Sequence, residues 1–313
     1  MEKLPIELMI HIFQTAAYMF RSTERGTVVK LALTASFVYD TIAPILYERL
    51  VVTHRNQGAV SMLAQTGAVS FLEHVRFLWT GPDRIGIPRS VAELLLRATA
   101  VYGSMDVWDE IAAVQARAGV AIASDVHLWN VDLPVDLKEI QKSHLRSLTR
   151  VHSFIPQSGH DSMFSDFSRD AAGWTHHLLE LLPSLTALGF SHVNPISEDQ
   201  VEDAYSKDLE AFETIIRTVK ATREPCVQVV ALRITGEAAA WLDAYIRIVR
   251  DMDDDWAMQH MRIWVDKRDI FDWSAEVRLV GEDANKERSI WTEAKQLDWY
   301  REASCKPTLE TGI

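Results

Sequence analysis

The chain has only two cysteines among its 313 residues, Cys226 and Cys305. Two isolated cysteines are too few for the disulfide framework of a small secreted domain or for a zinc cluster. The 13 glycines never cluster, so no glycine-rich phosphate loop is present. No run approaches the roughly 18 apolar residues of a membrane span, and the charged start, with Glu2 and Glu7, does not resemble a signal peptide. We therefore expect no cofactor, no membrane partner, and a cytoplasmic or nuclear location.

Positive charge is also scarce. The chain has 32 Lys and Arg residues against 44 Asp and Glu residues, a net charge of −12. Residues 1–60 contain six basic and five acidic residues, a net of +1, which leaves −13 for the rest of the chain. Because affinity for nucleic acids comes largely from cationic groups, we expect no nucleic-acid partner.

Apolar surface is abundant, at 48% hydrophobic residues, and its pattern is clearest in residues 1–52. Pro5 suits the first turn of a helix. Leu8, Ile12 and Phe20 share one helical face, which predicts an amphipathic helix. A second helical segment follows, and we expect Pro44 to end it and to restart a short third helix. Three such short helices cannot bury all this surface against each other, so we expect them to dock onto the rest of the chain or onto a partner.

The opening Leu4-Pro5-x-Glu7-Leu8, followed by Ile12-Phe13 and by an Ile-Leu-Tyr run some thirty residues later, resembles an F-box, most closely the F-box-like domains of fungal proteins. The resemblance implies a three-helix module that binds the Skp-type adaptor of cullin–RING ubiquitin ligases. The tryptophan often found after the second helix is absent, and Tyr39 stands nearest to it. The residues that match the family's adaptor-binding motif are Leu4, Pro5, Leu8, Ile12 and Phe13.

Beyond residue 60, apolar residues recur three, six and eight positions after a first one. Leu182, Leu185, Leu188 and Phe190 fit this pattern. Similar patterns begin at Leu72, Ala123, Leu145, Cys226 and Ala257, and the residues that end each pattern alternate as in a strand. They predict strands centred near residues 77, 128, 150, 187, 231 and 263, separated by helical segments, with Cys226 buried.

Strands and helices that alternate in this way resemble a leucine-rich-repeat solenoid, but an irregular one, because regular repeats recur every 20–29 residues or so. The predicted fold class is therefore α/β, with an N-terminal three-helix F-box-like module followed by an irregular leucine-rich-repeat-like solenoid. The predicted domains are 1–52 for the module, 53–304 for the solenoid with a C-terminal cap, and 305–313 for a tail. An ordinary α/β domain with hydrophobic strands is the alternative.

In a solenoid, residues that alternate with the buried ones line an exposed concave sheet. We expect this exposed set to include Leu128 and the candidate client-binding residues Trp79, Arg150, His152, Arg233, Arg262 and Trp264. Aromatic residues and arginine are common in binding hot spots, and arginine suits carboxylate or phosphate. The face is predicted to bind an acidic or phosphorylated client segment; arginines paired with local acids are the alternative.

The sequence patterns that could indicate a catalytic or metal site are weak. His176 and His177 are adjacent on a predicted helix and point about 100° apart, so they do not form one metal site with Glu180. The run 251–255 has no turn glycine nearby, unlike calcium loops. We therefore predict no catalytic residues, no metal site and no enzymatic activity.

The sequence predicts a substrate-recruiting adapter of a Skp–cullin–F-box ubiquitin ligase. Its partners would be the Skp-type adaptor, the cullin complex and an unknown client protein. One alternative is an interaction scaffold that is not coupled to a ligase. Another is an α/β hydrolase-like enzyme in which residues 1–52 are a helical cap.

Overall fold

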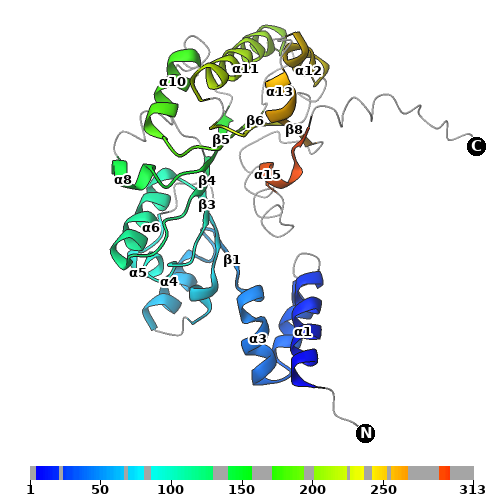
Figure 1. Cartoon of the computed structure of the whole chain (residues 1–313). Helices are drawn as coiled ribbons and strands as arrows, with labels where there is room; N and C mark the ends of the chain where they lie inside the picture. The colour runs from blue at the N-terminus through cyan, green and yellow to red at the C-terminus, as the bar shows by residue number, and fades with distance from the viewer. Residues whose placement is uncertain are drawn as a thin grey trace, which may run out of the picture. The chain divides into compact units, whose positions relative to one another are not determined.

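The computed structural model describes residues 5–20, 24–66, 70–80, 86–129, 140–156, 171–193, 201–223, 226–235, 242–251, 255–266 and 289–296. It is a mixed α/β structure with nine strands and twelve α-helices in these ranges (Figure 1). The chain divides into two compact units. The first comprises Met1–Trp129 with Glu276–Ser289, and the second comprises Asn130–Ala275 with Ile290–Ile313. This division falls inside the predicted 53–304 region.

The first unit begins with three helices and continues with four strands. Its elements are α1 (Ile6–Phe20), α2 (Arg25–Ala32), α3 (Ser36–Leu46), β1 (Arg49–Val52), α4 (Gln57–Thr66), the 3-10 helix η1 (Ser70–His74), β2 (Phe77–Thr80), α5 (Arg89–Ala92), β3 (Ala100–Gly103), α6 (Met105–Ala118) and β4 (Asp125–Trp129). The strands are parallel in the order β1-β2-β3-β4. Helices α4, α5 and α6 lie on one side of them (Figure 1).

The second unit also alternates helices and parallel strands. Its elements are α8 (Lys142–Leu145), β5 (Arg150–Pro156), α10 (Ala171–Leu181), β6 (Ala187–Val193), α11 (Val201–Arg223), β7 (Val229–Thr235), α12 (Leu242–Asp251), α13 (Asp255–His260), β8 (Met261–Asp266), α15 (Ile290–Glu293) and β9 (Lys295–Gln296). Strands β5 to β8 are parallel, and β9 pairs antiparallel with β8. Helices α10 and α11 lie on one side of β5–β8 and α15 lies on the other (Figure 1).

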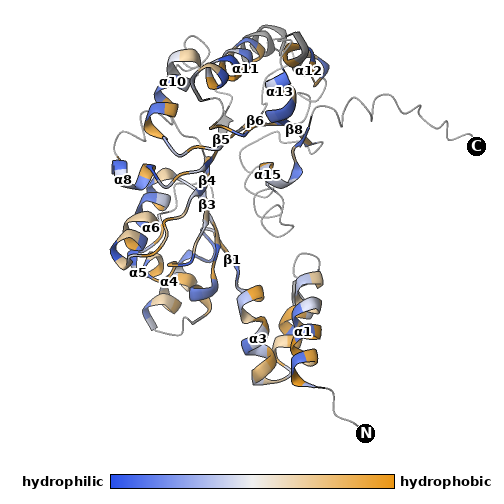
Figure 2. Ribbon diagram, in the orientation of Figure 1, coloured by the Kyte–Doolittle hydropathy of each residue, from blue (hydrophilic) through white to orange (hydrophobic). Residues whose placement is uncertain are grey.

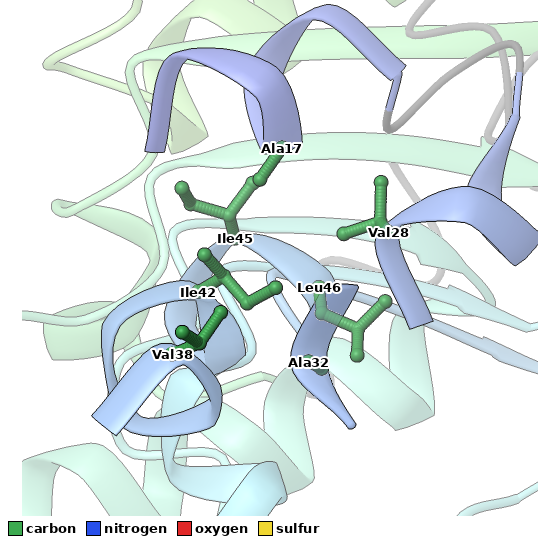
Figure 3. Close-up of a cluster of buried hydrophobic side chains, with 7 residues drawn as sticks. All are labelled: Ala17, Val28, Ala32, Val38, Ile42, Ile45 and Leu46. Atoms are coloured by element: carbon green, nitrogen blue, oxygen red, sulfur yellow. The ribbon is translucent and has the colours of Figure 1, made fainter. Parts of the chain in front are cut away.

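The three N-terminal helices form a small core of their own. Its buried members are Ala17, Val28, Ala32, Val38, Ile42, Ile45 and Leu46 (Figure 3). Ala17 comes from α1, Val28 from α2 and Ile42 from α3, so each helix contributes to one cluster. Tyr47 extends this core toward Phe71 of η1, with ring centroids 5.2 Å apart.

The prediction that Pro44 ends a helix is wrong. Pro44 lies inside α3, which runs on to Leu46. The break comes earlier, at Ala35, whose backbone is extended and which caps the start of α3. Proline inside a helix removes one i→i−4 hydrogen bond, and α3 continues for only two residues beyond Pro44.

A repeated buried triplet precedes and enters several strands. Its members are Leu72, Val75 and Leu78; Leu95, Ala98 and Val101; Leu145, Leu148 and Val151; and Leu182, Leu185 and Leu188, all at most 2% exposed. In each triplet the second residue donates its N–H to the carbonyl of the first, as from Leu185 to Leu182 at 3.2 Å. The same local turn therefore delivers the chain into successive strands.

Strand register gives the period of this repetition. In the first unit, Leu50, Leu78, Val101 and Val126 are paired in register and recur every 23–28 residues. In the second unit, Val151, Leu188, Val230 and Met261 are paired and recur every 31–42 residues. The longer interval accommodates longer helices, such as α11 with 23 residues.

The six predicted strand centres lie in β2 and β4 to β8, so these predictions are confirmed. Strands β1, β3 and β9 were not predicted. Three predicted patterns, those beginning at Ala123, Cys226 and Ala257, are shifted along the sequence. Val126 pairs with Val101, so Leu128 lies on the helix side and His127 takes its place on the opposite face. Val230 pairs with Leu188, and Cys226 is exposed, not buried.

Helix α6 shows how local sequence sets the ends of one repeat. Ser104 caps its start by accepting a hydrogen bond from the Val107 N–H at 3.4 Å, and Gly119 caps its end at φ 69°. That positive φ favours glycine because it has no Cβ. On its buried face, the amide of Gln115 donates to the Ala98 carbonyl and accepts from the Ala123 N–H, each at 2.8 Å. Gln115 therefore joins the turns that lead into β3 and β4.

Candidate functional site

The N-terminal module presents apolar side chains on the outer surface of α1. Leu8, Ile12 and Met19 are 46%, 49% and 67% exposed. At 100° per residue these three positions lie within about 40° of one another and opposite Ala17, which is fully buried in the module core. Helix α1 therefore has apolar residues on its outer surface as well as on the side that packs in the module core. Figure 2 shows hydrophobic and hydrophilic residues along the same helix. We call Leu8, Ile12 and Met19 the outer stripe.

The predicted adaptor-binding residues divide into three groups. Pro5, Leu8 and Ile12 are exposed, as docking on a partner requires. Phe13 is only partly buried but packs against the module core, and its ring meets Phe37 edge-on at 6.2 Å. Leu4 lies outside the described residues.

Met19 was missed by sequence reasoning. The spacing of residues 8, 12 and 19 on one helical face was a readable signal for it. The prediction had placed Leu8 and Ile12 on the same face as Phe20. In the structure Phe20 packs with the module core, because at 100° per residue it lies closer to the buried Ala17 than to Leu8.

The strand face opposite the helices differs from the predicted open surface. In the first unit, the rings of Trp79, Tyr102 and His127 form a continuous stack across β2, β3 and β4, with centroids 3.5 and 3.7 Å apart. All three side chains are buried. The prediction that Trp79 is exposed is therefore wrong: its side chain is 5% exposed and stacks on Tyr102 of the next strand. Asp125 lies beside this stack, 3.3 Å from His127 Nε2.

In the second unit, most of the predicted client-binding residues are buried as well. Arg233 is 4% exposed and donates to Asp266, 2% exposed, at 2.7 Å, while its guanidinium lies 4.4 Å from the ring centre of Trp264. His152 is buried and lies 2.7 Å from the hydroxyl of Ser191. The expectation of an exposed face is therefore wrong for His152, Arg233 and Trp264.

Arg150 and Arg262 stand apart from this buried set. Arg150 is exposed at the start of β5. Arg262 is partly buried and donates to the carbonyls of Gln259 at 2.6 Å and Met261 at 2.9 Å. Partial burial lowers the pKa of the Arg262 guanidinium, since desolvation disfavours the charged form. For Arg233, the alternative of an arginine paired with a local acid is the one found.

The second unit's strand face is covered by the chain's own C-terminal segment. Ile290 of α15 is buried in a cluster with Ala231 and Trp264, and Trp291 packs against the same cluster. Trp291 also meets His152 edge-on, with ring centroids 6.2 Å apart. Gly189 makes this possible: a Cβ there would lie 2.9 Å from Cη2 of Trp291 and 3.3 Å from Cδ1 of Ile290.

The adjacent histidines of α10 contact different partners. Nδ1 of His176 lies 3.3 Å from the hydroxyl of Thr222 on α11, whereas Nδ1 of His177 lies 3.8 Å from Glu180. Within the described ranges, no three His, Cys, Asp or Glu side chains gather as metal ligands would. None of the described helices has the length and hydropathy needed to cross a membrane.

Neither a family model, nor a curated protein, nor a solved structure matches this chain.

Proposed function

We propose that this chain is a substrate-recruiting adapter of a Skp–cullin–F-box ubiquitin ligase, and that the Skp-type adaptor docks on the outer stripe of α1. The observation that carries the proposal is the exposure of Leu8 and Ile12 on the side of α1 that faces away from the module core. The apolar surface of α1 is wider than the side that packs in the module core, so it leaves Leu8 and Ile12 without an apolar neighbour in the module. Exposed clusters of this kind mark interaction sites.

The N-terminal sequence supports this choice of partner. Pro5 opens the helix, and its backbone carbonyl accepts hydrogen bonds from the N–H groups of Leu8 and Met9 at 3.1 and 3.2 Å. Three helices with a shared core agree with the F-box-like resemblance of residues 1–52. Tyr39, at the position nearest to the missing tryptophan, packs against that core and meets Tyr47 edge-on at 6.4 Å. It thereby stabilises the module core, which positions α1 and its outer stripe.

The remaining strand–helix repeats are proposed to be leucine-rich-repeat-like and to hold the client. Intervals of 23–28 residues between registered positions in the first unit agree with the period of about 20–29 residues in that class. The chain itself would carry out no chemistry. It would act by holding a client near a conjugating enzyme in the complex, which raises the effective concentration of reacting groups. Such an adapter would work in the cytoplasm or nucleus.

The proposal is tested by titrating a purified Skp-type adaptor against the full chain and against Leu8→Asp/Ile12→Asp. We expect submicromolar binding by the wild-type chain and a loss of at least about 100-fold in the variant, because two buried charges would replace apolar contacts. The matched control is Met62→Asp, which changes an apolar residue that is 60% exposed on α4. This control should bind as the wild type does.

Absence of binding by the folded wild-type chain would overturn the ligase proposal. Equal binding by the wild type and the Leu8→Asp/Ile12→Asp variant would overturn the assignment of the site to α1. In the first case an uncoupled interaction scaffold would remain, since the outer stripe would still need a different occupant.

A further inference from the structure

The second unit contains a hollow in the sheet face opposite α10 and α11. Its floor is Gly189 of β6 and Ala231 of β7, which are paired in register, with His152 next to Gly189 and Arg262 next to Ala231. Two adjacent small residues leave space above the sheet that larger side chains would fill. Trp264 and the Arg233–Asp266 pair border this space on β7 and β8.

Helix α15 occupies the hollow with two neighbouring side chains. Ile290 is buried against Ala231 and Trp264, and the indole of Trp291 lies over Gly189 and beside His152. The fit is specific, because a single added methyl group at Gly189 would meet the indole at 2.9 Å. Such contact distances are shorter than ordinary van der Waals contact.

The attachment of this segment is short. Helix α15 has four residues, too few to be stable without the contacts it makes. Strand β9 adds two residues, Lys295 and Gln296, paired with the edge of β8 at Ile263 and Arg262. Both residues of β9 are exposed. The described contacts of this segment with the sheet include the packing of Ile290, Trp291 and Ala294 and the pairing of β9 with β8. Because α15 and β9 together span only seven residues, another short segment with the same apolar groups has the size to replace them.

We propose that this hollow is the client-binding site and that Ile290–Gln296 is an intrachain occupant, which a client segment replaces. The client would carry an aliphatic residue followed by an aromatic one in a helical turn. It would then pair with the edge of β8 in an extended conformation, as β9 does. The aromatic ring would lie over Gly189 and the aliphatic side chain against Ala231 and Trp264. This inference rests on the proposed function only in calling the ligand a client.

The intrachain occupant is covalently linked to the site, so it competes with any peptide that is added in a binding assay. A segment in the same chain competes at an effective concentration on the order of millimolar. A free segment of equal intrinsic affinity therefore binds weakly until the occupant is removed.

The test uses the full chain and a fluorescent peptide that copies residues 287–298. We expect Ile290→Ala/Trp291→Ala to bind the peptide about tenfold more tightly, or better, than the wild type in fluorescence anisotropy, because the competing segment is weakened. The same peptide with alanine in place of its tryptophan should not bind. Adding Gly189→Val to the double variant should abolish binding, since the valine side chain fills the hollow.

Failure of the folded double variant to bind the peptide would overturn the proposal. Peptide binding that stays equally tight after Gly189→Val is added would overturn it as well.

Hydrogen exchange supplies a second measurement that needs no peptide. In Gly189→Ala, amides of 290–296 should exchange about tenfold faster while those of β2 to β4 are unchanged. Unchanged exchange at 290–296 would also overturn the proposal. The adaptor titration on the double variant separates the two proposals, since the outer stripe is left intact.

Discussion

The two units differ in the side chains that fill the strand face opposite their helices. In each of them the position after the buried strand residue faces away from the helices. In the first unit these positions hold Trp79, Tyr102 and His127, whose rings stack on one another. In the second they hold His152, Gly189 and Ala231, and a separate segment, α15, fills the space.

Among the described residues, the first face is filled by side chains of neighbouring strands and the second is covered by a distant part of the chain. The stacked rings of the first face belong to residues 23–25 positions apart. Small residues on the second face leave room for Ile290, which lies 59 residues after Ala231 in the sequence. The client site proposed above depends on this second arrangement.

The buried ion pair of the second unit provides the largest expected effect. Arg233→Met should lower the free energy of unfolding of that unit by about 3–5 kcal/mol, because the buried Asp266 carboxylate would lose its ion pair with Arg233. Chemical denaturation with hydrogen exchange at β7 would measure the change. The control Arg233→Met/Asp266→Leu should recover most of the loss. A single-variant loss below about 1 kcal/mol would contradict a role for this pair in closing the second face.

The aromatic stack of the first unit provides the next largest effect. Tyr102→Ala should destabilise that unit by about 3 kcal/mol, since it leaves a cavity and removes both ring contacts. Tyr102→Phe keeps the ring and should cost less than about 1.5 kcal/mol. Hydrogen exchange at β2 to β4 is the measurement. Equal losses for the two variants would mean that the ring itself contributes little.

The smallest effect on stability is expected for an exposed ion pair on the helix side of the second unit. Arg217 donates to Glu213 from Nε and Nη2 at 2.9 and 2.7 Å on α11, but both side chains are exposed. Arg217→Ala should therefore cost only about 0.3–0.5 kcal/mol, the usual range for an exposed pair one helical turn apart. Thermal unfolding at two salt concentrations would measure it. A loss near that of Arg233→Met would show that burial of the pair is not what separates them.

Much of the strand arrangement was predictable because each strand follows a local pattern. The triplet Leu182, Leu185 and Leu188 marks one turn and one strand start, and all three residues are buried. The equivalent triplet Leu95, Ala98 and Val101 was overlooked, although its spacing is the same. Patterns beginning at Ala123 and Cys226 were shifted, because apolar residues that fit the spacing occur on both faces of β4 and β7.

The candidate site was predictable in part. Exposure of Leu8 and Ile12 followed from a helix with more apolar surface than three short helices can cover. Burial of Arg233 did not follow from its neighbours in the sequence, because its partner Asp266 lies 33 residues away. Arginine and aromatic residues at alternate strand positions give the same sequence pattern whether the strand face is exposed or buried.

The sequence by itself determined the alternation of helices and strands, the three N-terminal helices and the buried residue of most strands. These follow from side-chain period and from residues such as Pro5 and Gly119, whose effects are local. Only the tertiary structure decided which strand faces are closed, and by what. That outcome depends on contacts such as Trp79 with Tyr102 and Trp291 with His152, between residues far apart in the chain, whose approach no local pattern specifies.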